Sequence, residues 1–493
     1  MKYRKSIFYS ILIVIFILIV TLLTISIILY SLNNNGNAVP LTNDTFRAFL
    51  VISCIVLVIL IILFVIVRSK PASVLRGTAK DVDIHFEEYD INAKAETVDK
   101  LEAKRALNRE PSQVQISTIT PDGKPIADED INTSDVRFFM LKRIDEKYEE
   151  YKEPKYNNEI TLKELCEDFR NFAANRLKLY YDILDIRRFI AGLAVTKLLI
   201  LQGMSGTGKT SLPYAFGEYL RNKTTIVPIQ PMWKERTDLI GYYNEFTRKF
   251  NETTLLNKMY EANYNKQIYI TVLDEMNIAR VEYYFAEFLS LLEIPNLDGR
   301  ELDVVSDVWE KDPILLRNGK LKLPRNMWFI GTANNDDSTF AISDKVYDRA
   351  MVINLDKKAE VFEGERTEEL TLSIDHLEEL FINAQNEYGI TDRNLRRIKE
   401  LDKYLTETFR ITFGNRIMKQ IRAYVPVVVA SGGEELEAID DILSRKVLRK
   451  LESKNPVSVR AQAEGLCTFI EDLFGTNNMP LCIETIHHIE QNV

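Results

Sequence analysis

The sequence has few cysteines, and their spacing does not pair them. Its 493 residues include four cysteines that lie far apart, with no CxxC or CxxH pattern: Cys54, Cys166, Cys467 and Cys482. This spacing argues against a zinc knuckle and against a disulfide framework. A chain of this length is long enough for two or three domains, each with its own core. We therefore expect reduced thiols and a fold that depends on packing.

An excess of positive charge is also absent. The formal net charge is -9 at pH 7 and the isoelectric point is near 5.4. Such a balance argues against a nucleic-acid-binding surface over the whole protein. Any contact with nucleic acid would be made by a local basic patch or by a partner.

Charge is missing altogether from a long N-terminal stretch. No charged residue occurs from Ser6 to Asn43, and a second uncharged apolar run covers Ala48 to Val67. A membrane-spanning helix needs about 20 apolar residues, whereas the core of a cleaved signal peptide has about 7 to 15. We therefore predict two transmembrane helices, at about 6–32 and 47–67, and contact with a lipid bilayer.

Basic residues cluster at the outer ends of the two apolar runs. Three precede the first run (Lys2, Arg4 and Lys5) and four follow the second (Arg68, Lys70, Arg76 and Lys80). Because cytoplasmic flanks carry the excess of lysine and arginine, both termini should lie in the cytoplasm. The prediction is a double-pass protein of the cell membrane whose large C-terminal part is cytoplasmic.

The chain divides into a membrane anchor over 1–69, a charged juxtamembrane region over 70–157, an α/β region over 158–366 and a helical region over 367–493. We expect limited structure in 70–157, apart from a hairpin near 114–127 and a charged helix that ends near Pro154. Asp122, Asp145 and Lys147 have the spacing of a PD-(D/E)xK nuclease. Asp145 lies in a helical charge pattern instead of following an apolar strand, which favours a chance match.

Short apolar runs alternate with amphipathic helical patterns in 158–366. The runs are 197–201, 224–229, 268–273, 327–332 and 351–355. Strands separated by helices predict a parallel sheet with helices on both faces. After Thr367 only helical patterns remain, so we expect a helical lid.

The stretch GMSGTGKT, 203–210, follows the first predicted strand and precedes a helical pattern. It matches the P-loop motif G-x-x-x-x-G-K-[ST], whose glycines let backbone N–H groups turn toward phosphates at the start of a helix. Lys209 would pair with the β- and γ-phosphates and the Thr210 hydroxyl would ligate magnesium. The predicted nucleotide-binding residues of this loop are Gly203, Ser205, Gly206, Thr207, Gly208, Lys209, Thr210 and Ser211.

Two adjacent acids, Asp274 and Glu275, directly follow the third predicted strand. A P-loop needs a carboxylate at the end of a neighbouring strand for the magnesium shell, and Asp274 has this place. Glu275 follows directly, where it can activate the attacking water as a general base. An isolated pair of this kind would more simply begin a helix. Because a P-loop is present in the same chain, the roles in magnesium binding and water activation are favoured over a simple helix start.

Hydrolysis also needs a polar group that orients water and a cation for the developing phosphate charge. Asn334 follows the fourth strand, Arg349 precedes the fifth, and Arg416 lies in the helical region. Taken singly, each arginine could equally form a surface ion pair. Their order along the chain makes the two arginines candidates for the cation that stabilises the developing phosphate charge.

The chain resembles the AAA+ ATPases, and within them the dynein-related branch that includes the McrB-like proteins. The resemblance covers roughly 180–453, and its carriers are LQGMSGTGKTSLP, MWKERTDLIGYYNEF, VLDEMNIARVEYYFAEFLSLLE, GTANNDDS, YDRAMVI, FGNRIMKQI and LSRKVLRKL. It implies Asn334 as sensor 1, Arg349 as an arginine finger acting in trans, Arg416 as sensor 2 in the lid, and a ring, commonly a hexamer. The expected fold is an α/β P-loop AAA+ sheet with a C-terminal helical lid, preceded by two transmembrane helices.

Two departures from the McrB-like pattern matter. The McrB-like pattern of GTP dependence goes with a sequence like MNTADR, and ANNDDS stands in its place here. ATP with Mg²⁺ is therefore the expected cofactor pair, and GTP is the alternative. Membrane helices stand where those proteins have a DNA-reading domain, so recognition of methylated DNA does not transfer.

Three functions fit these residues. The first is a membrane-anchored nucleoside triphosphatase that drives a separate nuclease or effector in a defence system. The second is an ATPase that remodels membrane proteins and resembles the MoxR chaperones, with 296–326 contacting its clients. The third is a nucleotide-gated membrane scaffold without useful turnover. Glu275 argues against the third, since a scaffold needs no water-activating base.

Overall fold

The computed structural model describes residues 136–334, 339–355 and 358–492. They belong to one compact unit, Asn92–Val493. The predicted membrane helices at 6–32 and 47–67 and the hairpin near 114–127 lie outside the described residues. Among the helices that are described, none combines the length and the apolar character that a membrane span requires.

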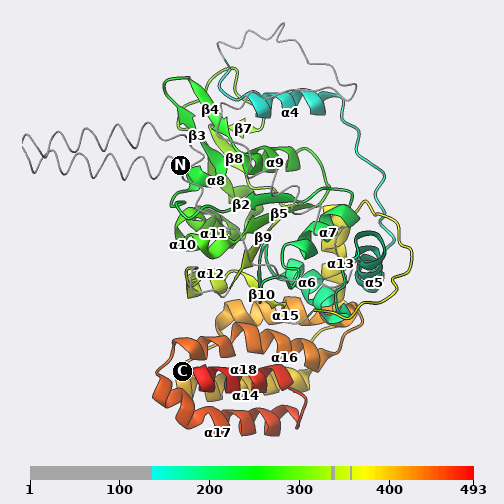
Figure 1. Ribbon diagram of the computed structural model, residues 1–493, viewed down its shortest axis with the longest axis vertical. Coiled ribbons are helices and arrows are strands. Elements are labelled where there is room, and N and C mark those ends of the chain that lie inside the picture. Colours follow the sequence, from blue (N-terminus) through cyan, green and yellow to red (C-terminus); the bar gives the residue numbers. More distant parts are fainter. Residues whose placement is uncertain (1–135, 335–338, 356–357, 493) are drawn as a thin grey trace, which may run out of the picture. The chain divides into compact units, whose positions relative to one another are not determined.

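A five-stranded parallel sheet forms the centre of the α/β part (Figure 1). Its order is β10-β1-β9-β5-β2, with β1 at Leu198–Gln202, β2 at Thr225–Pro228, β5 at Tyr269–Asp274, β9 at Met327–Ala333 and β10 at Met351–Asn354. These are the five predicted strands, and the expectation of an α/β fold with a parallel sheet is confirmed. Because all five run in one direction, the P-loop after β1 and the acids after β5 open on the same edge, with β9 between them.

Alternate residues of β1 enter two separate cores. Leu199 and Leu201 pack with α6 (Ile183–Val195) and α7 (Ser211–Tyr219), whereas Leu198 and Ile200 pack with α9 (Thr254–Ala262) and α11 (Ala286–Glu293). This two-residue alternation follows from the pleat of a strand. Since both faces are covered, β1 consists of apolar residues along most of its length, as expected for a buried parallel strand.

Helices make up most of the described chain after residue 373 (Figure 1). The α15 helix packs against both α6 and α16, so the helical part is joined to the α/β part through the helix that precedes β1. The helices here are α13 (Ile374–Glu387), α14 (Asp392–Phe409), α15 (Gly414–Ala430), α16 (Glu435–Lys446), η6 (Leu448–Ser453), α17 (Pro456–Phe474) and α18 (Pro480–Asn492).

Smaller elements interrupt the α/β part. The 296–326 segment, which the remodelling hypothesis assigns to client contact, forms a three-stranded antiparallel sheet in the order β6-β8-β7. The remaining strands and helices are α5 (Leu162–Phe172), η3 (Ala173–Leu177), α8 (Arg236–Ile240), β3 (Gly241–Asn244), β4 (Lys249–Glu252), η4 (Met276–Ile278), α10 (Val281–Tyr284), η5 (Leu297–Gly299), β6 (Glu301–Asp303), β7 (Leu316–Arg317), β8 (Lys320–Lys322) and α12 (Asp344–Tyr347).

The charged helix predicted within 70–157 is present as α4 (Phe139–Glu149), whereas its docking on the α/β part was not predicted. Phe138 and Leu141 are fully buried in the same core as α9. Arg137, just before the helix, is 2% exposed and pairs with Asp312 and Asp307 at 2.6 and 2.8 Å. The few apolar residues of this segment therefore dock it on the α/β part, although its charged composition suggested otherwise.

Asp145 and Lys147 of the nuclease-like pattern have structural partners in this contact. Asp145 is buried and accepts hydrogen bonds from Tyr260 and Tyr264. Lys147 forms an ion pair with Glu261 at 2.7 Å. Both side chains thus hold α4 to the α9 region, which favours the chance match over a nuclease site.

Leu141→Ala should destabilise the full chain by about 2 to 5 kcal/mol, because it removes buried methyl groups and leaves a cavity between α4 and α9. Phe139→Ala is the matched control, since Phe139 belongs to the same helix and is 38% exposed. Thermal unfolding of the two variants measures the difference. Equal midpoints would show that α4 does not contribute to the folded α/β part.

Candidate active site

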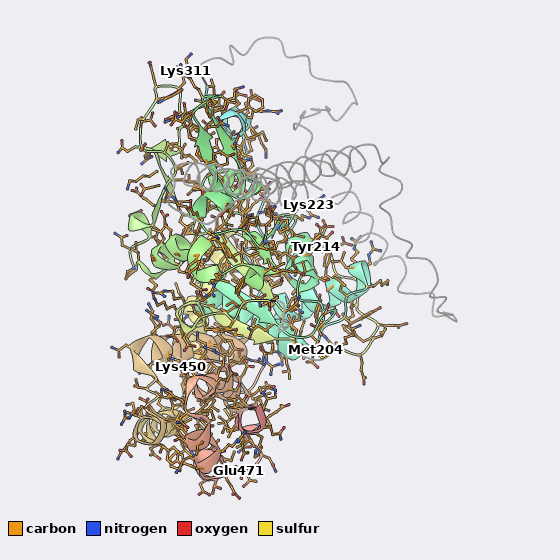
Figure 2. All side chains as sticks on the ribbon, turned by 60° about the vertical axis from the view of Figure 1, so that its left-hand side comes forward. Met204, Tyr214, Lys223, Lys311, Lys450 and Glu471 are labelled. Atoms are coloured by element: carbon orange, nitrogen blue, oxygen red, sulfur yellow. The ribbon has the colours of Figure 1, made fainter. Side chains whose placement is uncertain are left out.

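The P-loop connects β1 to α7 through three glycines with positive φ. The φ angles are 142° at Gly203, 79° at Gly206 and 92° at Gly208. A Cβ on Gly203 would lie 2.3 Å from the carbonyl oxygen of Leu355, so this position has neither the dihedral freedom nor the space for a side chain. Met204 is 74% exposed at the surface of the loop (Figure 2). The sequence thus folds here into the turn that the motif predicts.

Lys209 lies beneath this turn. It is 7% exposed, and its Nζ donates to the carbonyl oxygens of Gly203 and Met204 at 2.9 and 2.7 Å. These acceptors hold the ammonium group within the loop. A phosphate cradled by the loop would therefore meet a buried cation, where charge interactions are stronger than in water.

Asp274 joins the P-loop to the neighbouring strands. Its Oδ1 accepts a hydrogen bond from Thr210 Oγ1 at 3.0 Å and another from Thr332 Oγ1 at 2.8 Å. The structure therefore brings together Thr210 and Asp274, the two predicted magnesium ligands. Thr332, on the intervening strand β9, was not predicted. Its position near the carboxyl end of a predicted strand was the sequence feature that could have indicated a place in the site.

The donor set around Asp274 fits magnesium. No group of three or more histidine, cysteine, aspartate or glutamate side chains that could hold a metal exists among the described residues. A divalent cation at Thr210 and Asp274 could complete its shell with oxygen atoms of water and of phosphate groups. Magnesium commonly binds in this way, through one or two carboxylates together with water and substrate phosphates.

Glu275 differs from Asp274 in backbone conformation and exposure. Its φ and ψ are 52° and 48°, a left-handed conformation that costs an ordinary residue about 1 to 3 kcal/mol. Its backbone N–H donates to Thr332 Oγ1 at 2.9 Å, which helps to hold this turn. The side chain is exposed, whereas that of Asp274 is half-buried. The adjacent acids therefore have separate surroundings, as two separate roles require.

Thr332→Val should lower the free energy of unfolding by about 1 to 2 kcal/mol, because the Glu275 N–H loses its acceptor and Asp274 loses a donor. Thr332→Ser keeps the hydroxyl and serves as the control. Thermal unfolding compares the two variants. A valine variant as stable as the serine variant would contradict the role given to this hydroxyl.

Asn334 follows β9, at the same edge of the sheet as Asp274. Asn277, which is 4% exposed, donates from Nδ2 to the Asn334 carbonyl oxygen at 2.8 Å. The Asn277 carbonyl oxygen accepts from the Phe340 N–H, also at 2.8 Å. Asn277 therefore ties the backbone of the predicted sensor to the turn that carries Glu275. Sequence analysis did not single it out, although it stands three residues after Asp274.

Arg349 lies at the opposite end of the sheet from the P-loop. In the parallel pair of β1 and β10, Leu199 is opposite Met351 and Gln202 is opposite Asn354. Arg349 precedes Met351 by two residues, whereas Gly203 follows Gln202. At about 3.3 Å per residue, the level of Met351 is roughly 13 Å from the P-loop along the strand. This geometry separates Arg349 from the P-loop of its own chain.

Arg416 lies beside Arg349. Both arginines form ion pairs with Glu293, the last residue of α11: Arg349 Nη2 is 2.7 Å from Glu293 Oε2, and Arg416 Nη2 pairs with Oε1. The structure therefore brings the predicted sensor 2 residue to the predicted finger, at the end of the sheet away from the P-loop. Glu293 was not predicted as part of any site.

The helical part holds the backbone around Arg349. Lys446 Nζ donates to the carbonyl oxygens of Tyr347 and Ala350, both at 2.6 Å. Lys450, in the helical part (Figure 2), pairs with Asp348 at 3.1 Å. Burial lowers the pKa of Lys446 to about 7, and the nearby Asp348 carboxylate opposes this shift. These contacts fix the segment around Arg349 to the helices that follow it.

Comparison with known proteins agrees with this geometry. Residues 198–350, from the first residue of β1 to just before β10, match the AAA domain (dynein-related subfamily). No curated protein matches the chain.

Similar solved structures include a candidate ATPase from Cytophaga hutchinsonii, with 17% sequence identity and a TM-score of 0.41 over 68% of this chain and 97% of that one. A full-length MCM homologue from Methanopyrus kandleri has 12% identity and a TM-score of 0.35 over 60% of this chain and 62% of that one. The family match is the finding that identifies the nucleotide-binding part: the chain contains an AAA domain of the dynein-related subfamily, over residues 198–350.

Proposed function

We propose that this protein is a membrane-anchored AAA+ ATPase, resembling the McrB-like proteins, that drives a separate partner. An AAA domain implies nucleotide hydrolysis in general. The observation that carries the proposal is the position of Asp274, which binds the hydroxyl groups of Thr210 in the P-loop and of Thr332 on β9. This contact assembles a phosphate-binding loop and a magnesium-type carboxylate in one place.

Each residue of the site has a role in this reaction. The P-loop N–H groups and Lys209 bind the β- and γ-phosphates. Thr210 and Asp274 would hold Mg²⁺, which neutralises phosphate charge when it is bound. Glu275 accepts a proton from the attacking water, and Asn334 orients that water. Asn277 acts through both, since it holds the Asn334 backbone beside the turn that carries Glu275.

The placement of Arg349 supports assembly into a ring, which we propose to be a hexamer. Because Arg349 lies at the far end of the sheet from its own P-loop, its guanidinium would act on the nucleotide of a neighbouring copy. Head-to-tail contacts of this kind form a ring when the rotation between copies closes. AAA+ proteins typically form such rings.

The N-terminal sequence supports the membrane part of the proposal. The apolar runs at 6–32 and 47–67 have the length of spanning helices, and their basic flanks favour a cytoplasmic AAA domain. The partner in this proposal is a separate effector, such as a nuclease in a defence system. The alternative is a remodeller of membrane proteins like the MoxR chaperones. ATP is the proposed nucleotide because ANNDDS replaces the McrB-like sequence after Thr332.

The test of the reaction is phosphate release from ATP by the full chain, purified in detergent. Lys209→Ala should lower turnover by about 10²-fold or more, because the buried cation of the loop is lost. Lys223→Ala is the control, since Lys223 is an exposed lysine outside the P-loop (Figure 2). A wild-type chain that binds ATP without releasing phosphate would contradict the proposal and favour a scaffold.

Crosslinking in cells distinguishes the two kinds of partner. We expect one dominant nuclease or effector in the crosslinked product. A varied set of membrane proteins would instead favour the remodelling function.

A further inference from the structure

One carboxylate is shared by the two candidate phosphate-binding arginines. Glu293 pairs through Oε2 with Arg349 and through Oε1 with Arg416. The three side chains come from α11, from the segment before β10 and from α15. They are 32%, 25% and 49% exposed, respectively. Three separate elements thus bring two guanidinium groups to a single partly exposed anion.

The Glu293 carboxylate has the charge and the acceptors of a phosphate group. Guanidinium groups bind carboxylates and phosphates through the same forked geometry. Arg349 is also held by a second contact, since its Nη1 donates to the Lys345 carbonyl oxygen. The arginine pair can therefore bind a further anion in place of the carboxylate.

The strength of these ion pairs suits a reversible contact. Partly exposed ion pairs are weak in water, and a nucleotide phosphate presents more charge and more acceptors than one carboxylate. The backbone around Arg349 is held by Lys446 and Lys450, so release of Glu293 would free the arginine side chain without moving its segment.

We propose that Glu293 is a competitive latch: it occupies Arg349 and Arg416 until the phosphates of a neighbouring copy's nucleotide displace it. The latch rests on the proposed ATPase function and adds regulation to it. Glu293 then acts as a positioning residue that restrains the arginine pair in a chain without a neighbour. Removing its charge should make assembly into the active form easier.

The test is ATP turnover per subunit as a function of protein concentration, for the full chain in detergent. Glu293→Gln should lower the concentration at half-maximal turnover by about threefold to tenfold, because the arginine pair no longer has to leave an ion pair. Glu287→Gln is the matched control: Glu287 lies on the same helix, is 31% exposed and pairs with a single arginine, Arg236, at 2.9 Å. It should behave as the wild type.

A double-mutant cycle separates the latch from a general effect of the substitution. In an Arg416→Ala background, Glu293→Gln should give a smaller gain, because one of the two ion pairs is already lost. An equal gain with and without Arg416 would overturn the proposal. A loss of turnover in Glu293→Gln would also overturn it, because it would show that the carboxylate supports the arginines instead of restraining them. Wild-type and Glu287→Gln chains without turnover would contradict the ATPase function itself.

Discussion

Glu275→Gln should reduce ATP turnover by about 10² to 10⁴-fold while leaving nucleotide bound, since general-base catalysis contributes a factor of this size. The structure gives the reason for this split. The Glu275 side chain is exposed and makes no hydrogen bond to the P-loop among the described contacts, whereas its backbone N–H binds Thr332. The amide should therefore preserve the turn and the phosphate-binding loop but accept no proton from water.

The neighbouring acid gives the contrasting variant. Asp274→Asn changes the group that binds Thr210 and Thr332, so it should weaken magnesium-dependent binding of ATP. Equilibrium binding of a fluorescent ATP analogue, measured beside phosphate release, distinguishes the two variants. If Glu275→Gln released phosphate at the wild-type rate, the general base would have to be another group.

Arg349→Ala should lower turnover by about 10³-fold or more, since an arginine finger contributes 10³ to 10⁵ to phosphoryl transfer. Binding of ATP to each isolated chain should change little, because Arg349 lies at the opposite end of the sheet from its own P-loop. Arg221→Ala is a suitable control: Arg221 is 57% exposed and pairs only at the surface, with Glu369. Steady-state turnover and nucleotide binding test both expectations. A loss of ATP binding in Arg349→Ala chains at low protein concentration would contradict the finger role.

Sequence patterns were sufficient to predict the five strands of the central sheet and the P-loop. The five strands are short apolar runs bounded by helical patterns, and burial on both faces makes such runs visible in the sequence. The P-loop depends on local backbone conformation, which its glycines specify directly. These are features that neighbouring residues determine.

The contacts that complete the site depend on the order of the strands. Thr332 and Asp274 are 58 positions apart, and they meet because β9 lies beside β5. Glu293 in α11 is 56 and 123 positions from Arg349 and Arg416, and it meets them because the fold brings α11, α15 and the segment before β10 together. Apolar periodicity contains no information on which strands are neighbours, so Thr332, Asn277 and Glu293 could not be predicted as partners.

The docking of α4 was missed for a different reason. Its segment is highly charged and only a few of its residues, among them Phe138 and Leu141, are fully buried. Its charged residues also look solvated in the sequence, although Arg137 and Asp145 are buried and paired with residues far along the chain. Composition therefore underestimated the extent of the folded part.

Mixing two inactive variants tests most directly the claim that neighbouring copies complete one ATPase site. Chains with Glu275→Gln keep Arg349, and chains with Arg349→Ala keep Glu275. If Arg349 acts on a neighbour, an equal mixture in a random ring should regain about a quarter of wild-type turnover, because half of the sites keep Glu275 and half of their neighbours keep Arg349. If Arg349 acts within its own chain, every site lacks one of the two groups. A mixture that assembles but stays as inactive as its components would contradict the shared site.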